Sequence, residues 1–189
     1  MSEEKNYQNV FFFPMGEKIE KNTIDIDVDG KREEFFLDKE NKKILENNLE
    51  VDEFAELDYS NISFWGTSEN SKALWDKMKS DDLIFFSKSN GEFIYMAKIW
   101  FKVGKEEGGQ IISEEFWNNS ESDWCFVYFL KDMRKISITK KMMNRLIGYE
   151  EQHFFQGLFK ISDERVHEFW EQFPIYYFLH QSEFKGLGD

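Results

Sequence analysis

The chain has 189 residues, 41% of them hydrophobic and 18% aromatic, which predicts one folded domain, with or without an appendage, and excludes a largely disordered protein. It has no run of 18 apolar residues, which argues against a membrane-spanning helix, and its single cysteine, Cys125, excludes an intramolecular disulfide and a cysteine-based zinc site. The polar start and the lone cysteine favour a cytoplasmic location.

Charge is unevenly distributed along the chain. The 24 basic and 37 acidic residues give a net charge of −13, which argues against a nucleic-acid partner because Lys and Arg bind phosphates. Residues 1–60 hold 8 basic and 17 acidic side chains, whereas residues 61–189 hold 16 and 20. Residues 131–145 are the exception, with six basic side chains and one acidic. An acidic protein therefore retains one basic segment.

The first third of the chain predicts short elements. Three short strands are predicted, at residues 10–13, 23–28 and 33–37, and the middle one shows clean apolar alternation. The last two are expected to form a hairpin. Asp38 then caps a predicted helix in which apolar residues recur at helical spacing, namely Ile44, Leu45 and Leu49.

From residue 61 onward, strands and helices alternate irregularly. Strands are predicted at residues 62–65, 83–86, 93–103, 124–130, 136–138 and 154–161. Asn90-Gly91 predicts a hairpin between two of them. Helices are predicted after the capping residues Ser68 or Asn70, Ser113, Thr139 and Ser162, and the last of them is expected to end at Pro174. Hairpins without a repeating strand-helix-strand unit favour an α+β fold with a mixed, partly closed, barrel-like sheet flanked by helices.

No pattern typical of a catalytic centre is present. The three histidines, His153, His167 and His180, lie outside any zinc-binding helix motif, and no glycine-rich phosphate loop occurs. The carboxylates of Asp38 and Glu40 suit a capped helix start better than a nuclease centre. We therefore predict a non-catalytic protein that holds no metal ion and no cofactor.

Three consecutive segments resemble a known family. They are residues 62–70 (ISFWGTSEN), 82–87 (DLIFFS) and 90–99 (NGEFIYMAKI). They resemble the first half of a YTH or EVE domain of the PUA-like superfamily, in which a strand ending in Trp-(Ser/Gly/Ala)-Thr leads through a helix to two further strands. The rest, up to residue 173, is similar to the EVE-like specificity domains of McrB-type methyl-directed restriction subunits.

The resemblance implies that a methylated base is turned out of its strand into an aromatic cage. Trp65 matches the first cage tryptophan, and Trp117 is the best positional match for the second wall. Trp100 and Phe116 are substitutes for that second wall. The implied base contacts further include Gly66, Thr67, Ser68 and Asn70, although Asn70 suits a helix cap equally well.

Basic residues in the second half are the predicted phosphate contacts. They are Lys131, Arg134, Lys135, Lys140, Lys141 and Arg145. A solvated helix face is the alternative interpretation of the same residues. The tryptophans, too, have an alternative interpretation as core residues.

These observations predict an acidic extension at residues 1–58, a base-recognition domain at 59–173, and an aromatic tail or linker at 174–189. We expect recognition of methylated DNA, with methylated RNA left open, in a restriction or defence system whose nuclease or AAA+ motor is a separate partner. The alternative is an acidic protein-interaction module, such as a DNA mimic or an inhibitory subunit. A third hypothesis is a pocket for a free small molecule.

Overall fold

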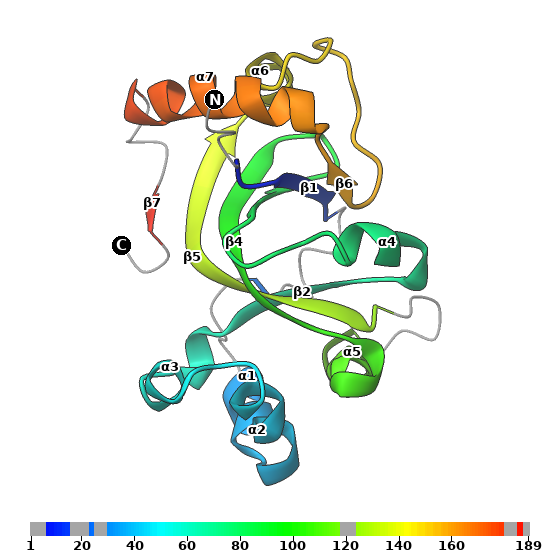
Figure 1. The fold of residues 1–189 in the computed structure, drawn as a ribbon, viewed down its shortest axis with the longest axis vertical. Coiled ribbons are helices and arrows are strands. Elements are labelled where there is room, and N and C mark those ends of the chain that lie inside the picture. Colours follow the sequence, from blue (N-terminus) through cyan, green and yellow to red (C-terminus); the bar gives the residue numbers. More distant parts are fainter. Residues whose placement is uncertain (1–6, 16–22, 25–29, 118–123, 180–184, 187–189) are drawn as a thin grey trace, which may run out of the picture. The chain divides into compact units, whose positions relative to one another are not determined.

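The computed structural model describes residues 7–15, 23–24, 30–117, 124–179 and 185–186. Its strands form a mixed sheet in the order β2-β5-β4-β3-β1-β6, with β7 paired to β5 (Figure 1). Helices and strands are interspersed along the chain, so the predicted α+β class with a mixed sheet is confirmed. No helix in these described ranges is long and apolar enough to cross a membrane.

By contacts the chain divides into two compact units, and strands β4 (Phe93–Val103) and β5 (Phe126–Ile138) each contribute to both. Unit 1 comprises residues 1–19, 81–98 and 132–189, and unit 2 comprises residues 20–80 and 99–131. The division into 1–58, 59–173 and 174–189 stays a prediction, and the contacts group the residues differently.

Unit 1 contains a parallel pair of strands. Besides the ends of β4 and β5, its elements are β1 (Val10–Pro14), β3 (Leu83–Ser87), α6 (Lys140–Leu146), β6 (Phe159–Lys160), α7 (Asp163–Leu179) and β7 (Lys185–Gly186). Strand β1 pairs in parallel with β3 and antiparallel with β6. The buried carboxylate of Asp82 accepts hydrogen bonds from the backbone and side-chain amides of Asn9 (2.9 and 3.0 Å), which fixes the start of the β1–β3 register.

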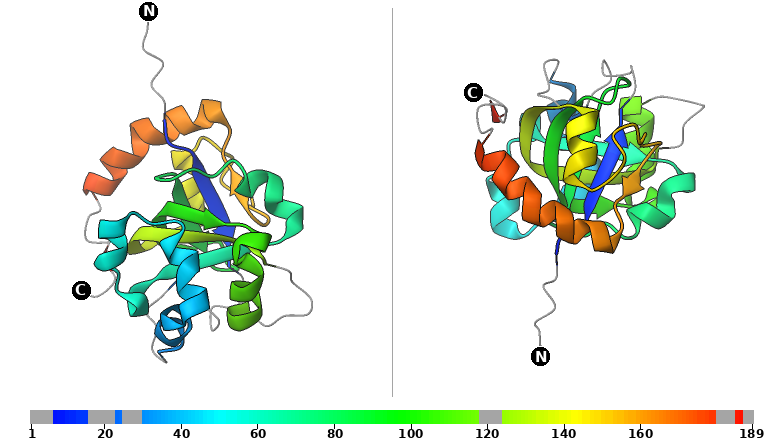
Figure 2. Two further views of the ribbon diagram at one scale, coloured as in Figure 1. Left: turned by 60° about the horizontal axis from the view of Figure 1, so that its bottom comes forward. Right: turned by 90° about the horizontal axis from the view of Figure 1, so that it is seen from above.

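Aromatic side chains fill the core of unit 1. Phe12, Phe85, Phe93 and Phe169 are fully buried in one apolar cluster. Helices α6 and α7 pack against each other and contribute to this cluster (Figure 2). Strand β1 lies between β3 and β6 and is buried, which explains why its sequence is almost wholly apolar.

Unit 2 combines short helices with the antiparallel pair β2–β5. Its elements are α1 (Lys31–Leu37), α2 (Lys39–Glu46), α3 (Val51–Ala55), η2 (Tyr59–Asn61), β2 (Ser63–Thr67), η3 (Glu69–Ser71), α4 (Lys72–Trp75), η4 (Lys105–Glu107) and α5 (Gly109–Trp117). Strand β2 pairs with β5 so that Trp65 lies opposite Tyr128. The cap of α2 is confirmed, because Asp38 accepts from the amides of Glu40 and Asn41.

Two predicted strands are helical or shorter in the structure. Residues 33–37 are part of α1 because Arg32 and Phe36, four residues apart, are buried together on one helix face. Of the strand predicted at 154–161, only Phe159–Lys160 is a strand, and the Ile161 amide adds a hydrogen bond to the Val10 carbonyl (3.1 Å). The strand predicted at 23–28 lies mostly outside the described residues.

Other predicted boundaries shift while the elements remain. The strand at 136–138 continues β5 without a break, and α7 runs through Pro174 to Leu179. A proline removes one backbone donor from a helix, but burial of Phe173 in the core favours continuing it. The Asn90-Gly91 hairpin is confirmed, with Gly91 at a φ of 84°, and so is the Thr139 cap, which accepts from the Met142 amide.

We predict that Arg32→Met destabilises the protein. The Arg32 side chain is 3% exposed, and its Nη1 donates to the carbonyls of Ile62 (2.7 Å) and Thr23 (3.2 Å). Leaving these buried acceptors without a charged donor should lower the free energy of unfolding by about 3 kcal/mol, measured by chemical denaturation. Lys31→Met, at the neighbouring exposed position, is the control and should lower the free energy of unfolding by less than about 1 kcal/mol. Equal effects of the two substitutions would contradict this role of Arg32.

Candidate nucleic-acid interface

Three tryptophans of unit 2 lie in mutual contact. Trp65 is in β2, Trp117 ends α5, and Trp124 precedes β5. Their ring centroids are 6.1 Å apart for Trp65 and Trp117, 5.5 Å for Trp65 and Trp124, and 5.7 Å for Trp117 and Trp124. Trp65 and Trp117 are 1% and 2% exposed, whereas Trp124 is half-buried. The structure thus brings the two predicted cage walls together and adds Trp124, which we call the tryptophan trio.

Gly66 makes this close packing possible. A Cβ atom at position 66 would lie 2.6 Å from Cζ3 of Trp117 and 2.6 Å from the backbone oxygen of Trp124. Both distances are shorter than any real carbon contact, so a side chain here would displace either an indole or the backbone. The Trp65-Gly66 dipeptide therefore combines one wall of the trio with the space for the other two.

The trio leaves no base-sized gap in this conformation. The rings of Trp65 and Trp117 are tilted by 64°. A base stacked between two parallel rings needs about 7 Å between their planes, because contacting carbon atoms are about 3.5 Å apart. A base can enter only if one indole turns or moves outward.

Two buried polar groups near the trio have no hydrogen-bond partner among the described residues. They are Nε1 of Trp117 in the trio and the hydroxyl of Tyr128, the residue paired with Trp65 in the β2–β5 ladder. Burial raises the pKa of the Tyr128 hydroxyl well above its ordinary value, so the group is a neutral donor at physiological pH. Each unpaired buried donor costs about 1–3 kcal/mol, which a ligand that accepts hydrogen bonds would recover.

The other predicted base contacts have different surroundings. Thr67 is buried in β2, Ser68 is half-buried, and Asn70 is exposed in η3. Ser68 and Asn70 therefore present polar groups to solvent next to Trp65 in the sequence.

The two substitute cage residues pack against the apolar cluster that includes Trp117. Trp100 contacts the Phe101 ring, and its Nε1 lies 3.4 Å from a Glu53 carboxylate oxygen. Phe116 packs edge-on against Phe64, with 4.9 Å between ring centroids. Their ring contacts in the described part of unit 2 are with phenylalanines, whereas the trio members contact one another.

The predicted phosphate contacts on β5 differ in exposure. Lys131 is half-buried, whereas Arg134 and Lys135 are exposed. Nη1 of Arg134 donates to the hydroxyl of Tyr177 (2.7 Å) on α7. That guanidinium is consequently oriented by the helix.

The predicted phosphate contacts on α6 meet a single carboxylate. Lys141 and Arg145 both pair with Glu151, at 2.8 Å from Lys141 Nζ and 2.8 Å from Arg145 Nε. These two donors hold the pKa of the Glu151 carboxyl below its ordinary value. Lys140 lies over the ring of Phe154, which is 53% exposed. The α6 surface therefore presents three cations, one exposed aromatic ring and one acid.

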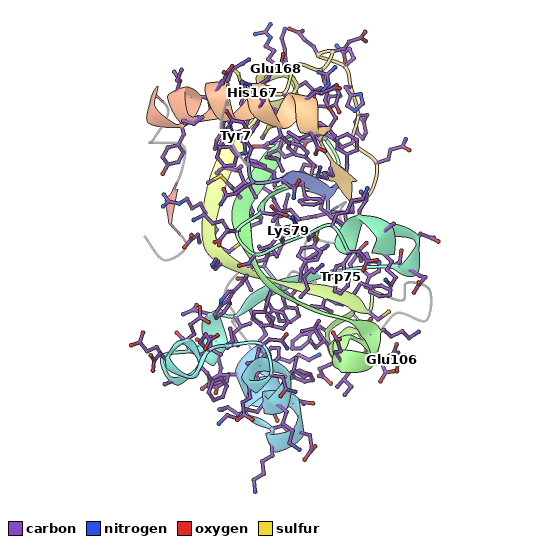
Figure 3. All side chains as sticks on the ribbon, in the orientation of Figure 1. Tyr7, Trp75, Lys79, Glu106, His167 and Glu168 are labelled. Carbon is purple, nitrogen blue, oxygen red and sulfur yellow. The ribbon has the colours of Figure 1, made fainter. Side chains whose placement is uncertain are left out.

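Within the described ranges, no cluster of three or more His, Cys, Asp or Glu side chains is arranged to hold a metal ion. His167 lies 3.5 Å from Glu171 on the exposed side of α7, with Tyr7 against its ring (Figure 3). This is a surface contact, as its spacing on one helix predicts. Cys125 is fully buried.

Comparison with known proteins bears on the fold. No model of a known protein family matches the chain, and no curated protein is detectably related to it in sequence. Among solved structures, the N-terminal domain of Thermococcus gammatolerans McrB bound to m5C DNA matches with a TM-score of 0.55 and 17% identity. The chain shares its fold with that McrB domain. The match covers 89% of this chain and 98% of the McrB domain, so the predicted resemblance to McrB-type domains is confirmed for the fold.

We predict that Gly66→Ala disrupts the trio. Its new methyl group meets backbone as well as the Trp117 ring, so the free energy of unfolding should fall by about 2 kcal/mol or more. Gly157→Ala is a control with open space around it, where a φ of 62° alone should cost about 1 kcal/mol. Chemical denaturation measures both variants. A smaller loss for Gly66→Ala than for Gly157→Ala would show that the trio tolerates a wider spacing.

Proposed function

We propose that the chain binds DNA that carries a methylated base, accommodates the base at the tryptophan trio, and has no catalytic activity of its own. Two observations support this. The chain shares its fold with an McrB domain whose solved structure is bound to m5C DNA. The trio combines flat apolar walls with the unpaired Nε1 of Trp117, which suits a planar ligand with acceptors on its edge.

Contact between Trp65 and Trp117 is the observation on which the proposal chiefly rests. Trp124 is the most exposed of the three rings, so its outward movement exposes the least apolar area. A flipped base would then take the place of Trp124 against Trp65. The edge of the base and its sugar would form hydrogen bonds with the hydroxyls of Thr67 and Ser68 and with the side-chain amide of Asn70.

Methyl discrimination follows from burial of the methyl group. One buried methyl contributes about 0.8 kcal/mol, which corresponds to roughly a fourfold preference over an unmodified base. A stronger preference requires hydrogen bonds that distinguish the modified edge. The trio itself supplies the apolar share of the discrimination.

Phosphates would be bound by the basic residues of α6 and β5. Lys141 and Arg145 would exchange Glu151 for phosphate, at small cost because exposed ion pairs contribute little. Cleavage in a restriction or defence system would be the work of a partner nuclease or nucleotide-driven motor.

An acidic interaction surface is the second candidate function. The net charge of −13, concentrated in the first 60 residues, favours it. Such a module would bind a basic protein in the manner of a DNA mimic and would bind no oligonucleotide.

We expect a methyl preference that depends on the trio. Oligonucleotides with N6-methyladenine, 5-methylcytosine, N4-methylcytosine or no modification, as duplex, single strand and RNA, are compared at low and moderate salt by fluorescence anisotropy. Trp65→Ala and Trp117→Ala should bring the affinity for the preferred oligonucleotide to within about twofold of the unmodified one, since the methyl then loses its apolar contact.

Trp170→Ala on α7 is the matched control, because it removes the same side chain outside the trio. Circular dichroism identifies any variant that is unfolded, and Asn70→Ala, at an exposed position, gives a milder test of the same site. Wild-type protein that binds every oligonucleotide equally, or none, would exclude methyl recognition. The second result would favour the acidic interaction surface.

Removal of Glu151 should strengthen DNA binding. In Glu151→Gln, Lys141 and Arg145 lose their competing carboxylate, so affinity should rise about three- to tenfold at low salt and the salt dependence should steepen. Glu171→Gln, an exposed acid on α7, controls for the change in net charge. The same gain in both variants would mean that α6 has no special part in phosphate binding.

A further inference from the structure

Unit 1 contains a pocket to which the proposed function assigns no ligand, although Arg134, which lines it, is also one of the proposed phosphate contacts on β5. It lies between α7 and strands β3, β4 and β5, all within the residues assigned to unit 1. Its volume is about 520 Å³, within the range of roughly 300–1,000 Å³ that is typical of small-molecule sites. Size alone thus suits a compact organic molecule.

Apolar side chains form most of the pocket. Met96 comes from β4, Leu83 from β3, and Phe173 and Trp170 from α7. Nε1 of Trp170 donates to the backbone oxygen of Gln8 (2.9 Å), so the polar edge of this indole is already satisfied. A ligand in the pocket therefore meets a surface that offers it mainly dispersion and burial.

Charged groups from β4 and β5 line the same pocket. Nζ of Lys98 pairs with the Asp132 carboxylate at 2.7 Å, which neutralises both groups. Arg134 makes no ion pair with the residues that the structure describes. Its Nη1 donates to the Tyr177 hydroxyl at 2.7 Å, and the guanidinium carbon lies 5.8 Å from the centre of the Tyr177 ring. Among the described residues, the pocket therefore has one positive charge without an ionic partner, and Tyr177 holds it in place.

This combination selects a ligand class. An apolar body would displace water from the walls, and an anionic group would pair with the remaining donors of Arg134, which favour planar carboxylate-like anions. A polar ring such as a nucleobase would lose hydrogen bonds along its edge, because the walls offer few partners. A cation would be repelled by Arg134.

We propose that this pocket is a binding site for a small amphiphilic anion, with an aromatic or aliphatic body and one carboxylate, sulfonate or phosphate group. Arg134 binds the anionic group, and Tyr177 positions Arg134. The walls supplied by β4 and α7 bury the apolar body.

Two fluorescent probes that differ only in charge test the proposal. One is 8-anilinonaphthalene-1-sulfonate, and the other is N-phenyl-1-naphthylamine, which has the same rings without the sulfonate. The full chain should bind the sulfonate saturably at one site and at least tenfold more tightly than the amine. Absence of saturable binding, or equal affinity for the two probes, would overturn the proposal.

Variants assign the binding to this pocket. Arg134→Gln changes an exposed side chain, so the variant should fold. This substitution should weaken sulfonate binding at least tenfold and change amine binding less than threefold. Met96→Trp adds bulk on the face of β4 that packs against α7, so it should fill the pocket and weaken both probes at least tenfold. Lys88→Gln, an equal loss of charge elsewhere in unit 1, should change neither. Unchanged sulfonate affinity in Arg134→Gln would refute the assignment, whether or not Met96→Trp folds.

Discussion

Strands β4 and β5 are the constraint on which the rest of the structure depends. They span 11 and 13 residues, and each contributes one end to unit 1 and the other to unit 2. In unit 2, the end of β5 pairs with β2 and so sets the position of Trp65 opposite Tyr128. In unit 1, the other end provides Arg134 to the pocket. The tryptophan trio and the pocket thus each depend on one end of β5.

Local signals predicted those parts of the fold that local physics determines. Asp38, Thr139 and Asn90-Gly91 act through hydrogen bonds and backbone angles within a few residues, and their elements were correctly predicted. Residues 33–37 were wrongly predicted as a strand because adjacent Phe35 and Phe36 suit either structure. The helix follows from burial of Arg32 and Phe36 on one face, which depends on distant partners such as Ile62.

The candidate site was predictable in part for a similar reason. Trp65 and Trp117 were singled out from a resemblance, and the structure places their rings in contact, while their role with a base stays a prediction. The sequence around Trp124 and Tyr128 does not mark either residue as part of a site. Trp124 precedes β5 and Tyr128 lies in it, and an apolar strand of this kind is expected in any core. Only the β2–β5 pairing shows that one contacts Trp65 and the other lies opposite it. The pocket beside Arg134 likewise combines residues from three strands and a helix.

The tryptophan trio also has an optical consequence. Three indoles with centroids within 6.1 Å of one another are close enough for their electronic transitions to couple. Such coupling gives a near-ultraviolet circular dichroism signal whose sign and size depend on the angles between the rings. Displacement of one indole would remove part of that signal, so the protein has an intrinsic spectroscopic reporter of its own ring geometry.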